Sequence, residues 1–414
     1  MLSKLLSAFR SPHFSGTSLV YAATKMALST SITNSAVQRE EQVLVEKAKH
    51  SRTILLNRPR QLNAISYWMT GHLRMIYEEW EKETDVQVVL VKGSGRAFSA
   101  GGDVAEVYRF GKQGYHEKSM HFFSQEYNVN YLIGTYKKPH VALIDGIVMG
   151  GGAGLSLNGS FKVVTEKSVF AMPETGLGLH PDVGASYFLS RLPGHLGEYV
   201  ALTGARLDGA ELLAVGLATH YVLSERLPHL EEKLKDLESG NFGAVDETIR
   251  QFSEHPKYRE ESILCRLEDI DRCFSRSTVE EIIAALEERK ERSQDKWYAT
   301  TVETLRKASP TSLKITLKSI REGRNQTFYE CLKREYRMTV RCLLGEWSND
   351  FYEGCRAILI DKDKNPKWDP PTLAAVTPAM VDHYFLPFQK PIEELHLSGA
   401  RGLQTAVKMV HPRL

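Results

Sequence analysis

The chain has 414 residues, of which 42% are hydrophobic and 25% are charged, and its formal net charge is +2. This composition is typical of a globular protein with one large domain and further helices, and it gives no reason to expect a nucleic-acid partner. No apolar run approaches the ~20 residues of a membrane-spanning helix, so we expect no membrane span. The five cysteines lie between Cys265 and Cys355 without C-x-x-C spacing. That pattern favours packed thiols over disulfides or a zinc site.

The first half of the chain alternates short strands with helices. No Asp or Glu precedes Glu40, and residues 1–39 are Ser-rich with scattered Lys and Arg, which indicates a targeting or disordered extension. Two runs of Val, Ile and Leu within residues 42–59 predict a strand hairpin. A helix is predicted next, because Met69, Leu73, Ile76 and Trp80 recur at spacings of four, three and four and would face the core.

A strand is expected over residues 86–93, followed by a glycine-rich loop in which Asp103 would cap a helix. Residues 116–135 are expected to be helical, and HVALIDG (140–146) is expected to form a buried strand. Because strands, glycine turns and helices continue to alternate, the sequence predicts an α/β core over residues 40–224.

The remainder of the chain reads as helical. Residues 225–375 are expected to pack on the core as a helical region, and residues 376–414 to form a tail. Ser277 and Glu280 have the spacing of a capping box, and Pro310 and Gly323 would begin and end another helix. Further helical stretches are expected over 331–344 and 351–360, followed by a charged, Pro-rich loop over 361–371.

Two neighbouring segments carry the residue types of acyl chemistry. Residues 150–154 contain four glycines, which allow backbone N–H groups to approach a ligand closely. About twenty residues later, Glu174 and Asp182 stand in short segments rich in Pro and Gly. Backbone donors can stabilise a developing oxyanion, and carboxylates can move protons.

Three long motifs in this order resemble the crotonase (enoyl-CoA hydratase/isomerase) superfamily: GRAFSAGGDV, KKPHVALIDGIVMGGGAGLS and FAMPETGLGLHPDVGASYFLSRLPG. Within it the chain is most similar to the 3-hydroxyisobutyryl-CoA hydrolase branch, especially its plant members, from about residue 42 to about residue 375. The resemblance implies an α/β fold, a spiral of ββα units with a helical C-terminal region. It also implies hydrolysis of the thioester of 3-hydroxyisobutyryl-CoA, or of a close short 3-hydroxyacyl-CoA, to free CoA and the hydroxy acid, as in valine catabolism.

The resemblance also implies roles for individual residues. The backbone N–H groups of Gly102 and Gly151 would form the oxyanion hole. Glu174 would act at the thioester carbonyl, as base for the attacking water or as nucleophile, while Asp182 would bind the 3-hydroxyl group and orient the water. Glu126 matches a substrate-contacting glutamate. We expect burial to raise the pKa of Glu174 and polar surroundings to keep Asp182 ionised.

Two other functions stay open. Hydratases that resemble this chain carry a second glutamate just after the glycine cluster, where this sequence has Gly154, so a short-chain enoyl-CoA hydratase or isomerase is disfavoured. A catalytically silent CoA-binding protein is the third reading. His180 stands where the hydrolase branch usually has Phe, and we expect it to pack in the interior more than to line the pocket.

No metal-ligand spacing is visible, and no cofactor is expected besides the CoA of the substrate. The expected partner is an acyl-CoA, and a homo-oligomer is possible in this superfamily. Pro412-Arg413-Leu414 approximates a peroxisomal tripeptide. This signal and the resemblance favour the peroxisome, whereas the N-terminal composition favours the mitochondrion as the alternative.

Overall fold

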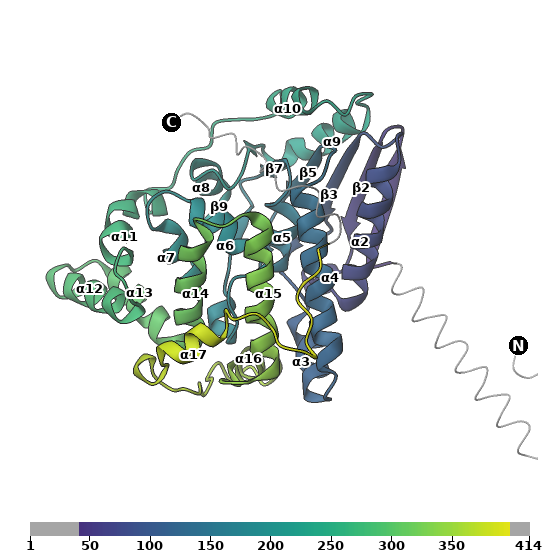
Figure 1. Cartoon of the computed structure of the whole chain (residues 1–414). Coiled ribbons are helices and arrows are strands. Elements are labelled where there is room, and N and C mark those ends of the chain that lie inside the picture. Colours follow the sequence, from purple (N-terminus) through teal and green to yellow (C-terminus); the bar gives the residue numbers. More distant parts are fainter. Residues whose placement is uncertain (1–40, 398–414) are drawn as a thin grey trace, which may run out of the picture.

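Two sheets form the core of the protein in the computed structural model, which describes residues 41–397 (Figure 1). In the six-stranded sheet β1 is antiparallel to β2 and the other neighbours are parallel, in the order β1-β2-β3-β5-β7-β10. The four-stranded sheet has the order β4-β6-β8-β9. The strands are β1 (Val43–Ala48), β2 (Ser51–Leu56), β3 (Val88–Gly93), β4 (Ala97–Ser99), β5 (His140–Ile144), β6 (Ile147–Met149), β7 (Phe161–Val164), β8 (Val169–Ala171), β9 (Leu207–Asp208) and β10 (His220–Tyr221).

The chain follows a spiral path, and each turn of the spiral adds one strand to the large sheet and one to the small sheet. β3, β5 and β7 enter the large sheet, and β4, β6 and β8, which follow them directly, enter the small sheet. Helices connect the successive turns. The expected spiral of ββα units is therefore confirmed, as is the predicted hairpin of β1 and β2.

The large sheet is covered on both faces, as its apolar strands predict. In β3, Val89 and Val91 belong to the main core, together with the inner faces of α2 (Tyr67–Lys82) and α4 (His116–Gly134). Val88 and Leu90 point the other way and pack with α9 (Leu227–Lys235) and α10 (Phe242–Arg250). The four apolar residues predicted to line one side of α2 are all buried.

The helices around the small sheet position the functional segments. Asp103 caps α3 (Val104–Lys112) by accepting a 3.1 Å hydrogen bond from the Glu106 N–H, as predicted. The glycine cluster forms the start of α5 (Gly151–Ser156), and all six residues of this helix are buried. The remaining helices of the core are α6 (Ala185–Phe188), α7 (Leu196–Thr203) and α8 (Gly209–Ala214).

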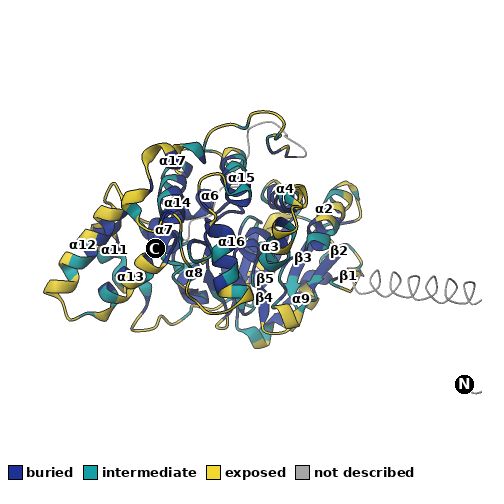
Figure 2. Cartoon of the chain, turned by 90° about the horizontal axis from the view of Figure 1, so that it is seen from below, coloured by how far each residue is buried: buried dark blue, intermediate teal, exposed yellow. Residues whose placement is uncertain are grey.

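The C-terminal helices pack directly on this core (Figures 1 and 2). α15 runs beside α4, and α14 contacts α6 and α7. The predicted capping box lies one residue later than expected, with Thr278 and Glu281 in place of Ser277 and Glu280, because Thr278 has the extended backbone of an N-cap. These helices are α11 (Leu267–Phe274), α12 (Val279–Arg292), α13 (Lys296–Lys307), α14 (Pro310–Gly323), α15 (Phe328–Leu344), α16 (Asp350–Cys355) and α17 (Pro378–His383).

Part of the segment assigned to a tail is packed. Beyond α17, Leu395 and Leu397 are buried, and the Asn128 amide of α4 donates a 3.0 Å hydrogen bond to the His396 carbonyl. Packing thus extends from residue 376 to residue 397. The N-terminal extension (1–39) and the tripeptide Pro412-Arg413-Leu414 lie outside the described residues. No helix within residues 41–397 is long and apolar enough to span a membrane, and all five cysteines are free thiols, of which Cys265 alone is exposed.

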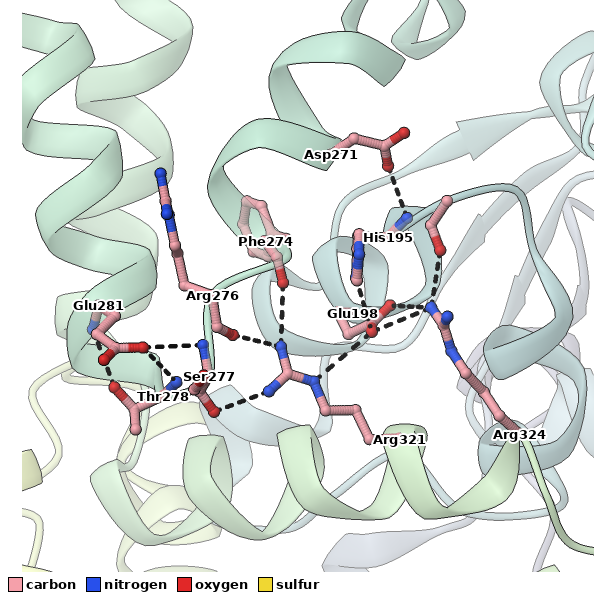
Figure 3. A network of polar contacts seen from close by, with 11 residues as sticks. His195, Glu198, Asp271, Phe274, Arg276, Ser277, Thr278, Glu281, Arg321 and Arg324 are labelled. Carbon is pink, nitrogen blue, oxygen red and sulfur yellow. Dashed lines mark hydrogen bonds and ion pairs between the residues drawn. The ribbon is translucent and has the colours of Figure 1, made fainter.

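An ionic network centred on the buried carboxylate of Glu198 ties α7 to the C-terminal helices (Figure 3). The carboxylate of Glu198 is fully buried and faces Arg324 at 3.2 Å, Arg321 at 3.8 Å and the His195 ring at 3.0 Å. Arg321 also donates to the Ser277 carbonyl at 2.8 Å, beyond the end of α11.

Replacing Glu198 by Gln is expected to lower the free energy of unfolding by ~2 kcal/mol, because a buried acceptor loses the charge that it presents to two partly exposed guanidinium groups. Glu287→Gln is the matched control, since the Glu287–Arg306 pair is exposed and should contribute less than ~1 kcal/mol. Urea denaturation of both variants measures the difference. Equal losses in the two variants would contradict the structural role of the buried pair.

Candidate active site

Two backbone N–H groups lie side by side between the small sheet and α5. Gly102 follows β4, and its loop is fixed by the Ile65 N–H donating to Gly101 O and the Asp103 N–H donating to Ile65 O, both at 2.8 Å. A Cβ built on Gly151 would lie 3.0 Å from the Gly102 nitrogen. The fold therefore brings together the two glycines predicted to form an oxyanion hole.

Both N–H groups are available to a ligand. Gly151 is the first residue of α5, so its N–H has no acceptor within the helix. Among the backbone hydrogen bonds of residues 41–397, neither Gly102 nor Gly151 donates to a carbonyl. Two fixed donors at one point suit an oxygen that gains negative charge during a reaction.

Three carboxyl groups surround this cradle. Glu126 on α4, Glu174 at the start of the short helix η3 (Glu174–Leu177) and Asp182 are 2%, 6% and 4% exposed. Glu126 Oε1 lies 2.2 Å from the position that a Cβ on Gly151 would occupy, and Glu174 Oε1 lies 2.8 Å from the corresponding position on Gly150. Asp182 is close enough that its charge acts on both Glu126 and Glu174, so the five predicted site residues lie together.

Burial and mutual repulsion disfavour ionisation of these groups. Burial, and then the charge of Asp182, raise the pKa of Glu126 and that of Glu174 well above the ordinary value. Burial raises the pKa of Asp182 to about 7, against a hydrogen bond from Tyr127 that lowers it. The rise at Glu174 has the expected direction, but burial also raises the pKa of Asp182, which the expectation from polar surroundings did not include.

Two carboxyl oxygens of the site have no protein partner. Glu126 Oε1 and Glu174 Oε2 are buried and accept no hydrogen bond from residues 41–397. Leaving a buried acceptor unpaired costs ~1–3 kcal/mol, so such atoms are expected where a ligand supplies the missing donor. Both oxygens are therefore suited to contact a substrate or its attacking water.

Asp182 is held by residues that sequence reasoning did not identify. Tyr127 Oη lies 2.6 Å from Asp182 Oδ2, and the hydroxyl donates to this oxygen when Asp182 is ionised. Val183, the next residue, has a φ of +55°, which is an outlier for a β-branched side chain and must be held by its surroundings. Asn158 donates to the Val183 carbonyl at 3.0 Å.

Glu335 on α15 fixes the other side of the same loop. Its carboxylate accepts from the Gly184 N–H at 2.7 Å and from the Ser186 N–H at 2.9 Å. The only signal in the sequence was an acidic residue among the apolar positions of a helix, and that signal did not indicate which loop it holds. Asp182 is therefore positioned by α4 and α15 together.

Gly154 is buried within α5, and no space is open beside it for a side chain. A Cβ on Gly154 would lie 2.6 Å from the Asn130 Nδ2 atom and 2.7 Å from Val183 Cβ. Asn130 is fully buried and occupies this space. A glutamate at position 154 would therefore require Asn130 to move.

His180 is fully buried, which confirms the expectation that it packs. It also makes polar contacts: Nδ1 lies 3.0 Å from the Pro181 carbonyl oxygen and Nε2 lies 3.1 Å from the Thr339 hydroxyl. In the part of the chain that the structure describes, no three His, Cys, Asp or Glu side chains are grouped to hold a metal ion.

Curated relatives cover most of the chain. It is 54% identical over 346 residues to 3-hydroxyisobutyryl-CoA hydrolase 1 of Arabidopsis thaliana, and this match covers 84% of this chain and 92% of that protein. It is 49% identical to the mitochondrial 3-hydroxyisobutyryl-CoA hydrolase-like protein 1 of the same plant, over 83% and 86% of the two chains. It is also 48% identical to the Arabidopsis small ribosomal subunit protein mS47, over 84% and 85%.

The fold is shared with a solved structure, that of a carnitinyl-CoA dehydratase from Mycobacterium thermoresistibile. The TM-score is 0.78 at 36% identity, and the match covers 87% of this chain and 99% of the other. The model of the enoyl-CoA hydratase/isomerase family matches residues 51–385. The chain therefore belongs to the enoyl-CoA hydratase/isomerase family.

Proposed function

We propose that this protein hydrolyses the thioester of 3-hydroxyisobutyryl-CoA, or of a close short 3-hydroxyacyl-CoA, as a step of valine catabolism. One observation carries the proposal: Glu174 lies against the glycine cluster with the charge of Asp182 acting on it, while the space beside Gly154 is taken by Asn130. The site thus has a carboxylate for the carbonyl and another for a substrate hydroxyl, but not the second glutamate of a hydratase. The names of the relatives support the same substrate.

In the proposed mechanism the thioester oxygen accepts from the N–H groups of Gly102 and Gly151. Water attacks the carbonyl carbon while ionised Glu174 accepts its proton, and the raised pKa of Glu174 makes that carboxylate a stronger base. The C–S bond then breaks and Glu174 returns the proton to the leaving sulfur. Asp182 accepts a hydrogen bond from the 3-hydroxyl group, and Glu126 contacts the acyl part.

Two assays on one preparation test the reaction class. Free thiol should appear from 3-hydroxyisobutyryl-CoA, whereas the absorbance of the conjugated enoyl thioester in crotonyl-CoA should stay constant. Loss of the enoyl absorbance without thiol release would instead identify a hydratase.

A catalytically silent role is the second candidate, because one relative at 48% identity is named as a ribosomal subunit protein. The carboxyl groups with unpaired oxygens argue against it, since a purely structural site gains nothing from them. A melting temperature raised by CoA esters, with no thiol release from a panel of acyl-CoAs, would favour the silent role.

We also infer a mitochondrial location in preference to the peroxisome first expected. The inference rests on the acid-free N-terminal composition and on a relative named as mitochondrial. Imaging of residues 1–40 and, separately, of residues 398–414 fused to a fluorescent protein distinguishes the two destinations.

A further inference from the structure

A chain of side-chain contacts runs from Asp182 away from the substrate site into the interior. Tyr127 Oη lies 2.6 Å from Asp182 Oδ2 and 2.8 Å from Thr339 Oγ1, and Thr339 Oγ1 lies 3.1 Å from His180 Nε2. We name these four residues the Asp182–His180 chain. All four are at most 4% exposed, so these contacts lie away from bulk solvent.

The tautomer of His180 follows from its other nitrogen. Nδ1 lies 3.0 Å from the carbonyl oxygen of Pro181, and a carbonyl only accepts, so Nδ1 carries a proton. In a neutral ring Nε2 is therefore bare and can only accept. Burial lowers the pKa of His180 to about 4, and the nearby Arg334 acts in the same direction.

The Asp182–His180 chain lacks one proton when Asp182 is ionised and His180 is neutral. Three contacts need three protons, but the hydroxyls of Tyr127 and Thr339 supply two. An ionised Asp182 and a neutral His180 supply none, so one contact must then join two acceptors. Adding one proton to either end fills every contact.

We propose that His180 is a positioning residue. Through Thr339 and Tyr127 it shares one proton with Asp182. With the proton on Asp182 Oδ2, this oxygen donates to Tyr127, Tyr127 donates to Thr339, and Thr339 donates to His180 Nε2. Passing one proton along each contact reverses all three bonds and leaves an Asp182 carboxylate and a His180 imidazolium. The total charge is the same in both forms.

Other charged and titratable groups face the Asp182–His180 chain and decide whether the shared proton lies on Asp182 or on His180. The low pKa of His180 places it at the Asp182 end in the free protein, in agreement with the raised pKa of Asp182. The groups that face Asp182 and His180 are Glu126 and Tyr127 on α4, Glu174 on η3, and Arg334, Glu335 and Cys342 on α15. A substrate hydroxyl that donates to Asp182 favours its carboxylate form. Substrate binding is therefore coupled to the position of the proton shared by Asp182 and His180.

The first test needs no activity and is independent of the proposed function. In nitrogen-15 NMR of the histidine rings, the resonance that disappears in His180→Phe should show the Nδ1–H tautomer. Its Nε2 shift should change with pH in step with Asp182, and this change should vanish in Asp182→Asn, whose amide always supplies the missing donor. An Nε2–H tautomer, or a titration unaffected by Asp182→Asn, would overturn the proposal.

The second test rests on the proposed hydrolysis and uses the pH dependence of kcat/KM. In His180→Phe two hydroxyl protons fill the two remaining contacts when Asp182 is ionised, and in Thr339→Val the Tyr127 proton fills the one remaining contact. An ionised Asp182 then leaves no contact without a proton, so both variants should lower the midpoint of the part of the acidic limb that Asp182 sets, beside that of the base Glu174, by about one pH unit. Desolvation by the new apolar side chains acts in the opposite direction, so the sign separates the two effects.

Thr339→Ser keeps the hydroxyl and should restore the original midpoint. Thr316→Val is the matched control, since Thr316 is a buried threonine on α14 whose hydroxyl has no partner among the described residues. An unchanged or raised midpoint in both chain variants overturns the proposal. If no variant or wild type releases thiol, the proposed function fails while the NMR result still decides the shared proton.

Discussion

Glu174→Gln is expected to reduce thiol release at least ~1000-fold while leaving acyl-CoA binding largely intact. The amide keeps the shape of the side chain but can neither take a proton from water nor attack the carbonyl. Stability should not fall, because Glu174 lies among other buried carboxyls and its Oε2 atom has no partner to lose. Single-turnover thiol release, calorimetric titration with CoA esters and thermal melting measure the three quantities.

Glu79→Gln is the control, because Glu79 is exposed on α2 and is not one of the candidate site residues. Its turnover should equal that of the wild type. Near-normal turnover in Glu174→Gln would remove Glu174 from the mechanism, and a collapse of melting temperature would assign the loss to folding instead.

Label in the Glu174 side chain after a single turnover of the wild-type protein in oxygen-18 water identifies a mixed anhydride that water opens at the Glu174 carbon. A general base never forms a bond to the carbonyl carbon, so the label then enters the hydroxy acid alone. Water that opens the anhydride at the substrate carbonyl also labels the hydroxy acid alone, so label in Glu174 is the decisive result. Mass spectrometry of the peptide that contains Glu174 reads the outcome.

The sequence predicted those features that depend on neighbouring residues. The core stripe of α2, the Asp103 cap and the limits of α14 follow from spacing and from local hydrogen bonds, and the structure has all three. The glycine cluster and Glu174 were visible because their chemistry is carried by short motifs. The one-residue error at Thr278 arose because two adjacent hydroxyl residues could each cap the helix.

Features made by distant segments could not be predicted in this way. Glu335 holds the loop after Asp182 from about 150 positions away, and Thr339 reaches Tyr127 across a still longer separation. The raised pKa of Asp182 depends on burial by these elements and not on the residues beside it in the chain. The rise in the pKa of Asp182 was not predicted for that reason, because local polarity does not report burial.

Gly151→Ala is expected to lower kcat/KM by ~100-fold or more through the predicted oxyanion hole. The new Cβ would stand 3.0 Å from the Gly102 nitrogen, in the space where a substrate oxygen accepts from both N–H groups. Gly71→Ala is the matched control: Gly71 lies within α2 with no atom near its Cβ position, so activity should be unchanged and stability should rise by ~0.5–1 kcal/mol.

The same Cβ would also meet Glu126 Oε1 at 2.2 Å, so Gly151→Ala could act by displacing that carboxylate. Combining it with Glu126→Ala removes this contact and isolates the effect on the N–H groups. If the cradle binds the thioester oxygen, the double variant stays ~100-fold below Glu126→Ala alone. If the double variant equals Glu126→Ala, the glycine serves to seat Glu126, and the charge that develops on the substrate must be stabilised elsewhere.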